Sequence, residues 1–130
     1  MRVYIAAPWV RKHDAIQAGR AFEAAGFKVL SRWFNHEGDP NDATGVTCEH
    51  QEVYRQALED VDDVQRADYL IVLNLEKSEG KAVETGIAIA NGIPFICVGP
   101  RSNVFQVFAE AMVDSVDDAI AHLHTISAAV

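Results

Sequence analysis

The chain has 130 residues, 49% of them hydrophobic, so it can bury the core of one domain over residues 1–130. The 19 Asp and Glu residues outnumber the 11 Lys and Arg residues, and the formal net charge of -8 disfavours nucleic-acid polymers and anionic membranes as partners. Because no apolar run reaches the roughly 20 residues of a membrane span and the amino terminus lacks a signal-peptide pattern, we expect a cytoplasmic protein.

Short apolar runs, each bounded by polar, Gly or Pro residues, predict strands at residues 2–6, 27–31, 69–73 and 93–98, with a fifth near 112–113. Helical periodicity predicts helices between them, at 12–25, 49–66, 82–90 and 117–127. Strand and helix alternate along the chain. We therefore expect an α/β fold, a single-domain, doubly wound, five-stranded parallel sheet of the flavodoxin or Rossmann type with helices on both faces.

Several residues are expected to end or begin these helices. Gly26 is the predicted stop of the first helix, and Ser115 is the predicted cap of the last one. The helix at 49–66 has apolar positions at Val53, Ala57, Val61 and Val64, which predict its packed face. Its acidic residues Asp62 and Asp63 are then expected on a solvated face.

The stretch 32–50 has no clear period, and irregular segments of this length in small domains are usually functional or disordered. It contains His36, Cys48 and His50, but their spacing is irregular and no CxxC or HExxH accompanies them, so we expect no metal site. Cys48 and Cys97 are expected to be unpaired and reduced. Trp33 and Phe34, near the start of the stretch, are predicted to pack over a cleft or to shape a base pocket.

Glu84 is the leading candidate for a chemical role. It follows the strand at 69–73 and the small-residue turn at 78–80, where open α/β sheets hold substrates. Near a helix start, unpaired N–H groups and the helix dipole favour a carboxylate, so we expect Glu84 to be an anion at neutral pH and able to act as a nucleophile. Glu is also common in first helical turns, and the spacing alone fits that surface role equally well. Asp60 is its candidate partner, because its helix leads into the strand that precedes Glu84.

Small and aromatic residues follow the first predicted strand. Ala7 and Pro8 would let a ligand approach the backbone at the carboxyl edge of the sheet, and the Trp9 indole could stack on a planar base. Trp9 fits equally well as a lid over the core.

In order and combination, these segments resemble the nucleoside 2-deoxyribosyltransferases and the related deoxynucleoside 5′-monophosphate N-glycosidases. The matching residues are Val3 to Trp9, Asp60, Ala67-Asp68, Gly80, Glu84-Thr85-Gly86, Ala88, Ala90, Gly92 and Pro94.

The resemblance implies that Glu84 attacks the anomeric carbon of a 2′-deoxyribose, displaces the base and forms a covalent intermediate. A second base or water then resolves it. It further implies that Asp60 contacts the sugar or assists proton transfer, that Tyr4 orients Glu84, and that Trp9 stacks on the base. No cofactor is required. The expected partners are nucleosides, nucleotides and nucleobases, and the expected assembly is a homo-oligomer with shared active sites.

Transfer to another base is the leading expectation, and hydrolysis of 5′-monophosphates or a non-catalytic nucleotide-binding module are the alternatives. Transferases of the family tend to carry an acidic residue six positions before the nucleophile, where this chain has Ser78. That difference favours the hydrolytic branch. Trp9 looks like the transferase pattern, however, and the Arg-Gly-Gly segment of the monophosphate N-glycosidases is missing.

In the family, the segment after the fourth strand reaches the 5′ end of the substrate. Ser102 or Asn103 would bind a 5′-hydroxyl, and Arg101, with Arg11 or Lys12, would bind a 5′-phosphate. The same Ser and Asn residues fit equally well as caps of a following helix.

Overall fold

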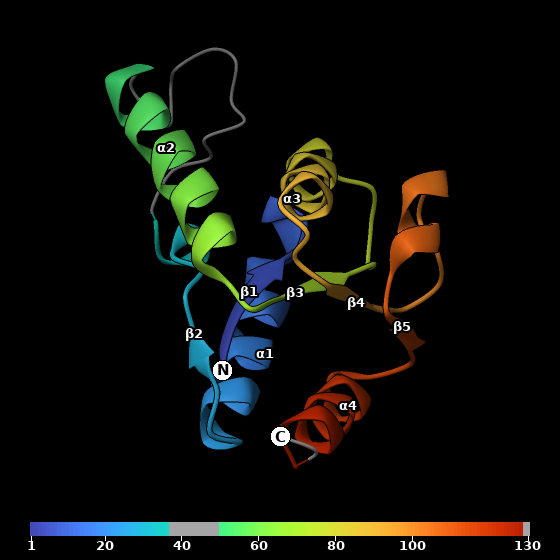
Figure 1. Ribbon diagram of the computed structural model, residues 1–130. Helices are drawn as coiled ribbons and strands as arrows, with labels where there is room; N and C mark the ends of the chain where they lie inside the picture. The colour runs from blue at the N-terminus through green and yellow to red at the C-terminus, as the bar shows by residue number, and fades with distance from the viewer. Residues whose placement is uncertain (37–49, 129–130) are drawn as a thin grey trace.

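The structure is a computed structural model that describes residues 1–36 and 50–128. Five parallel strands form one sheet in the order β2-β1-β3-β4-β5 (Figure 1). The strands are β1 (Arg2–Ala6), β2 (Lys28–Val29), β3 (Tyr69–Leu73), β4 (Phe95–Val98) and β5 (Ala111–Val113). This arrangement confirms the predicted parallel α/β sheet. The strand order reverses between β1 and β3, so a ligand crevice is expected beyond their carboxyl ends.

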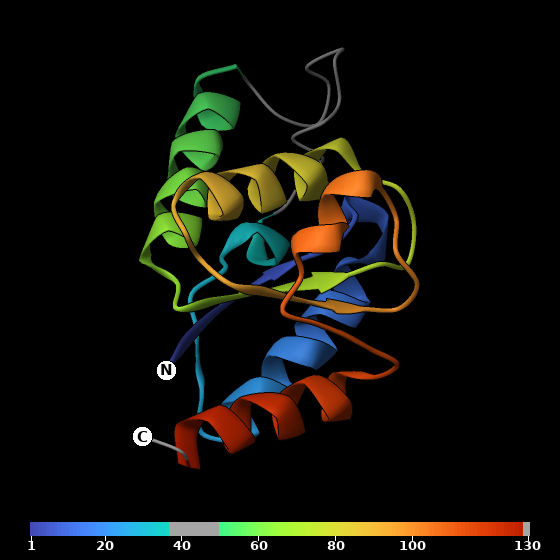
Figure 2. The same ribbon diagram turned by 45° about the vertical axis from the view of Figure 1, so that its right-hand side comes forward.

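Helices cover both faces of the sheet, as predicted (Figure 2). One layer contains α1 (Lys12–Ala24) and α4 (Val116–Ala128), and the other contains α2 (His50–Arg66) and α3 (Glu79–Ala90). Three short 3-10 helices join them: η1 (Trp9–Arg11), η2 (Trp33–Asn35) and η3 (Val104–Phe108).

The strands read as unbroken apolar runs because both faces of the sheet are covered. Every residue of β3 and β4 is buried, and the buried apolar side chains form one core cluster. Within the described residues, no helix combines the length and apolarity that crossing a membrane requires.

Three helix ends show how local side chains set the element bounds. Gly26 adopts a φ of 97°, and it follows α1 as predicted. The Ser115 Oγ accepts a hydrogen bond from Asp118 N at 3.1 Å, which confirms its capping role. The Ser78 Oγ accepts one from Lys81 N at 3.2 Å, so α3 begins at Glu79 rather than at the predicted residue 82.

The second strand is shorter than the predicted 27–31. The Ser31 Oγ accepts the Ile5 N–H at 3.1 Å in place of a backbone carbonyl, and the Trp33 Nε1 donates to Ile5 O at 2.8 Å. These side-chain bonds replace the end of the β1–β2 ladder. As a result, η2 is held against the carboxyl end of β1.

The four apolar positions of α2 are only partly packed, and Val53 is half-buried. Val64 is buried, but Val61 is 36% exposed and Ala57 is also exposed. The side of the helix that faces the sheet instead carries buried Gln56 and Asp63. The predicted solvated position of Asp63 is therefore wrong, whereas that of Asp62 is correct. Polar contacts described below compensate for burying Asp63.

Candidate active site

Tyr4 and Glu84 meet in the layer between the sheet and α3. Tyr4 is fully buried in β1, and its hydroxyl donates a hydrogen bond to the Glu84 Oε2. Glu84 lies on the same side of α3 as the buried residues Lys81, Thr85 and Ala88, as the helical period requires. The strand and the helix together fix both ends of this bond.

The expectation that Glu84 is an anion by virtue of a helix start needs correction. Because α3 begins at Glu79, Glu84 lies beyond the first turn, where the helix dipole acts weakly. Burial raises the pKa of Glu84 to about 8; the Tyr4 hydrogen bond opposes this shift and the negative charge of Asp60 adds to it. Tyr4, rather than the helix terminus, is the group that stabilises the anion.

Asp60 faces the same cavity from α2. Its Oδ1 is buried and has no hydrogen-bond partner in the described chain. Burial raises the pKa of Asp60 to about 7, the charges of Asp63 and Glu59 add to the shift, and Arg32 opposes it. Near neutral pH the two carboxyls, Asp60 and Glu84, therefore retain at least one proton between them.

The side chains of Asp60 and Glu84 line a cavity of about 190 Å³, which lies between α2, α3 and the C-terminal end of β1. Five predicted site residues besides Asp60 and Glu84 line this cavity: Ala7, Trp9, Trp33, Ser78 and Gly80. Val53, Gln56, Ala57 and Lys81 complete the lining. The predicted residues from four separate segments therefore do come together around one space.

Two indoles form one wall of this cavity. The ring centroids of Trp9 and Trp33 lie 6.1 Å apart with their planes inclined at 49°, and Lys12 Nζ lies 5.0 Å from the Trp9 ring centroid. Pro8 is buried and does not line the cavity; its carbonyl accepts the Arg11 N–H at 2.9 Å and so begins η1. Pro8 therefore lies at the start of the short helix that carries Trp9.

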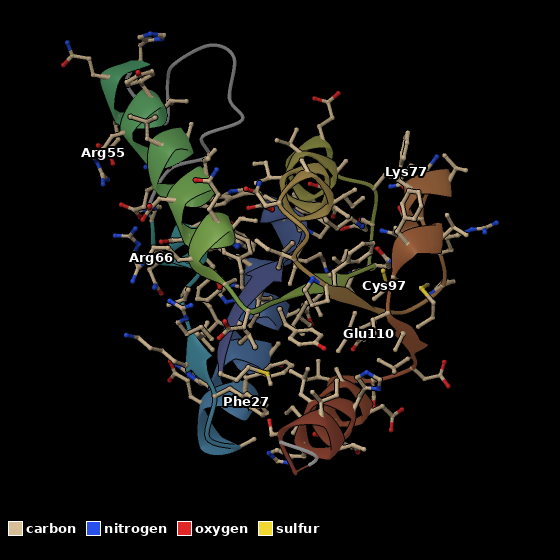
Figure 3. The ribbon with its side chains drawn as sticks, in the orientation of Figure 1. Phe27, Arg55, Arg66, Lys77, Cys97 and Glu110 are labelled. Carbon is tan, nitrogen blue, oxygen red and sulfur yellow. The ribbon has the colours of Figure 1, made fainter. Side chains whose placement is uncertain are left out.

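A second cavity of about 340 Å³ adjoins the first, and Ser78 and Lys81 line both. Ser102 and Asn103 face it, while the Asn103 Oδ1 also accepts from Phe105 N at 2.9 Å and begins η3. Asn103 therefore combines the capping position with a place in the cavity wall. Figure 3 labels Lys77, another lining residue, on the side of the molecule where η3 and the start of α3 lie.

Lys81 is a cavity residue that the sequence analysis missed. It is 2% exposed, and its Nζ donates to the Asn74 Oδ1 at 3.1 Å and to Glu76 O at 2.9 Å. No carboxylate of the described chain forms an ion pair with it, and burial lowers its pKa. Its spacing of three residues from Glu84, on the same helix face, was the available signal.

A reciprocal amide pair joins this lysine to the segment before η3. Asn74 Nδ2 donates to the Gln106 Oε1 at 2.7 Å, and Gln106 Nε2 donates to the Asn74 Oδ1 at 2.9 Å. The Gln106 Oε1 also accepts Ser102 N at 2.8 Å. These bonds hold the Ser102 segment against the end of β3.

Other candidate residues lie elsewhere. Arg101 is exposed and lines neither cavity, Arg11 pairs with Asp14 at 2.8 Å, and His36 Nε2 lies 3.0 Å from the Glu59 Oε1. Within residues 1–36 and 50–128, no three His, Cys, Asp or Glu side chains are grouped to hold a metal ion. Cys97 is a free, buried thiol, and Cys48 lies outside the described residues.

The fold and the cavity define a doubly wound α/β protein with two carboxyls at the switch point of its sheet. Neither a protein-family model nor a curated protein matches the sequence. Solved structures do share the fold. A 2-deoxyribosyltransferase from Bacillus psychrosaccharolyticus superposes with a TM-score of 0.65 at 19% identity, over 92% of this chain and 90% of that one.

Two further structures are similar. A conserved protein from Enterococcus faecalis V583 gives a TM-score of 0.65 at 18% identity, with 96% of this chain and 98% of that chain covered. A CMP N-glycosidase from Clostridium botulinum gives 0.58 at 16% identity, with 96% and 99% covered. At these identities the likeness establishes the shared fold.

Proposed function

We propose that this chain is a nucleoside 2-deoxyribosyltransferase-like enzyme that cleaves the N-glycosidic bond of 2′-deoxynucleosides and transfers the sugar to another base. The observation that carries the proposal is the Glu84 carboxyl, which accepts the Tyr4 hydroxyl bond and shares its cavity with Asp60. The shared fold with a 2-deoxyribosyltransferase and a CMP N-glycosidase supports it.

In the first half of the reaction, Glu84 attacks C1′ of the sugar, and its carboxylate oxygen forms a bond to C1′ while the C1′–N bond breaks. The base nitrogen keeps the electron pair and takes a proton from Asp60. In the second half, Asp60 accepts the proton of an incoming base, whose nitrogen attacks C1′ and releases Glu84. Tyr4 stabilises Glu84 as an anion before attack and as a leaving group afterwards.

The cavity walls suit the proposed substrate. Trp9 and Trp33 offer indole faces for a planar base, and Ala7 and Gly80 leave room for the sugar to approach. Ser102 and Asn103 face the adjoining cavity, so we place the 5′ end of the substrate there.

Chromatography of products tests this function. The purified chain is incubated with each 2′-deoxynucleoside, with and without a different free base, and a new nucleoside that forms only with the acceptor base is the expected result. Glu84→Ala should abolish it, whereas Glu23→Gln, an exposed glutamate on α1 of the opposite layer, should not. Substrate binding without any released base would instead indicate a binding module.

Hydrolysis of 5′-monophosphates is a second candidate function, and Lys81 is the observation that favours it. A buried ammonium with only neutral acceptors is costly, and an anionic ligand in the adjoining cavity would compensate its charge. The same incubation with 5′-monophosphates distinguishes the two functions, because hydrolysis releases base and sugar phosphate without an acceptor.

We also propose that the chain forms a homo-oligomer. The side chains of Val104, Phe105, Val107 and Phe108 on η3 are 63 to 68% exposed, and those of Tyr54 and Leu58 on α2 are 64% and 56% exposed. Apolar groups gathered in this way are typical of interfaces. Because η3 follows Ser102 and Asn103 directly, a second copy on η3 would lie beside the second cavity and complete its wall.

A further inference from the structure

Asp63 is a buried carboxylate that takes no direct part in the proposed reaction. It is 1% exposed and lies one helical turn after Asp60 on α2. Arg32, which precedes η2, donates to both of its oxygens, from Nη2 to Oδ1 at 2.7 Å and from Nε to Oδ2 at 3.0 Å. A two-pronged guanidinium contact binds a carboxylate strongly and in one orientation. The pair therefore fixes the Asp63 carboxylate one helical turn from Asp60.

The surroundings of Asp60 stabilise its ionised form poorly. Its buried Oδ1 receives no hydrogen bond from the described chain, and an ionised carboxylate without donors is more costly to bury than a neutral one. Glu84, by contrast, receives the Tyr4 hydroxyl bond. Asp60 therefore lacks the kind of hydrogen-bond donor that stabilises the ionised form of Glu84.

Charged groups approach Asp60 from each element packed around it, and most of them have other partners. Glu59 is bound by Arg55 at 2.9 Å, by His36 at 3.0 Å and by Arg32 at 3.5 Å. Figure 3 shows Arg55 on the outer side of α2. Lys81 donates to neutral oxygens instead. After burial itself, the charge of Asp63 is the largest cause of the raised pKa of Asp60, and the charge of Glu59 comes next. Arg32 acts in the opposite direction and lowers this pKa. Glu59 and Asp63 of α2, Arg32 beside η2, Tyr4 of β1 and Glu84 of α3 interact electrostatically with Asp60. Lys81 of α3 lines the same cavity, and His36 beside η2 contacts Glu59.

We propose that the Arg32–Asp63 pair positions the proton that the departing base takes up: the charge of Asp63 holds this proton on Asp60. Asp63 is thus a positioning residue, because it acts through Asp60 and not on the substrate. The role rests on the proposed function of Asp60 as the proton donor to the departing base.

The test compares two isosteric variants of the same helix. Asp63→Asn removes the buried charge, and its amide oxygen still accepts from Arg32, whose half-exposed guanidinium water can solvate. Asp62→Asn removes an equal charge one residue away, from a side chain that is 59% exposed and paired with Arg66. Carbon-detected NMR follows the Asp60 carboxyl as pH changes, and Asp60→Asn assigns its signal.

We expect Asp60 to titrate near neutral pH in the unaltered chain. Asp63→Asn should lower its midpoint by about one pH unit or more, the size typical of a nearby charge, and Asp62→Asn should leave it in place. If the Asp63→Asn protein is folded and Asp60 titrates as before, the proposal is overturned. If that variant fails to fold, the Asp60 midpoint of the unaltered chain provides the test. A midpoint below about pH 5 would also overturn the proposal.

The NMR readout does not depend on turnover, so the two proposals can fail separately. A shifted Asp60 midpoint in a chain that releases no base from any nucleoside would reject the proposed function and retain the effect of Asp63. Base release together with an unmoved midpoint would reject the role of Asp63 alone. If both proposals hold, the alkaline limb of the pH profile of kcat/KM should move to lower pH in Asp63→Asn. The shift should equal the shift of the Asp60 midpoint in pH units.

Discussion

The Tyr4 hydroxyl donates a hydrogen bond to Glu84, although 80 positions separate the two residues in sequence. One comes from the first strand and the other from the helix after the third strand, and the parallel pairing of β1 with β3 brings these elements together. The bond supplies the stabilisation of the anion that a helix terminus was expected to supply.

Tyr4→Phe should therefore lower kcat/KM for the proposed reaction by about 10- to 100-fold, since a hydrogen bond to a charged group contributes roughly 1.5–3 kcal/mol. Loss of the donor raises the pKa of Glu84 further, so the acidic limb of the pH–rate profile should move to higher pH. Tyr69→Phe is the matched control. Its hydroxyl donates to Glu110 at 2.8 Å, away from the cavity, and an equal loss of turnover there would contradict the assigned role.

Glu84→Gln should change how stability depends on pH. The raised pKa values of Glu84 and Asp60 mean that the folded chain binds more protons than the unfolded chain between about pH 4.5 and 8. Stability consequently falls as pH rises through this window. Glu84→Gln should therefore raise the free energy of unfolding more at pH 8.5 than at pH 5. In urea titrations the difference between the two pH values should be on the order of 2 kcal/mol.

Glu79→Gln provides the comparison for this measurement, because Glu79 is an exposed carboxylate in the first turn of the same helix. Parallel pH profiles for Glu84→Gln and the unaltered chain would show that Glu84 ionises as easily in the folded state as in the unfolded one.

Lys81→Met should distinguish a phosphate from a hydroxyl at the 5′ end of the substrate. If the second cavity takes a phosphate, the variant should lose about 10- to 100-fold in kcat/KM toward 5′-monophosphates and little toward nucleosides. Lys28→Met, at the exposed edge strand, should affect neither. Equal losses for both substrate classes would assign Lys81 to holding the Asn74 side chain instead.

Phe105→Ser on η3 and Leu58→Ser on α2 should show which of these two apolar surfaces forms the interface between copies of the chain. The variant at the true interface should shift the molar mass measured by light scattering toward the monomer, because a polar side chain there forfeits about 2 kcal/mol of apolar burial per copy. If η3 is the interface, Phe105→Ser should also lower turnover, since η3 borders the second cavity. Unchanged mass in both variants would exclude these faces.

Local patterns predicted much of the fold. Apolar runs located β1 and β3 at their observed bounds, and small polar residues such as Ser115 marked helix starts, because these signals act between neighbours in sequence. The second and fourth strands were exceptions, because both are shorter than their apolar runs predicted. At the end of the second strand the Ser31 hydroxyl replaces a ladder carbonyl, which depends on a partner from another strand.

The candidate site was predictable as a set of residues but not as a chemical state. The resemblance and the strand-turn-helix pattern pointed to Glu84, Asp60 and Tyr4, and the fold places them together. Asp63 and Lys81 were missed, because a charged residue on a helix is normally solvated. Only the packing of α2 and α3 against the sheet showed that both are buried.

The sequence by itself determined the alternation of strands and helices and the order of the reactive residues, since both depend on local propensity and spacing. The tertiary structure decided which carboxyls are buried, which have donors and which groups share a cavity. Those properties set the pKa values of Glu84 and Asp60, because burial and charge act through distances between segments that lie far apart in the chain.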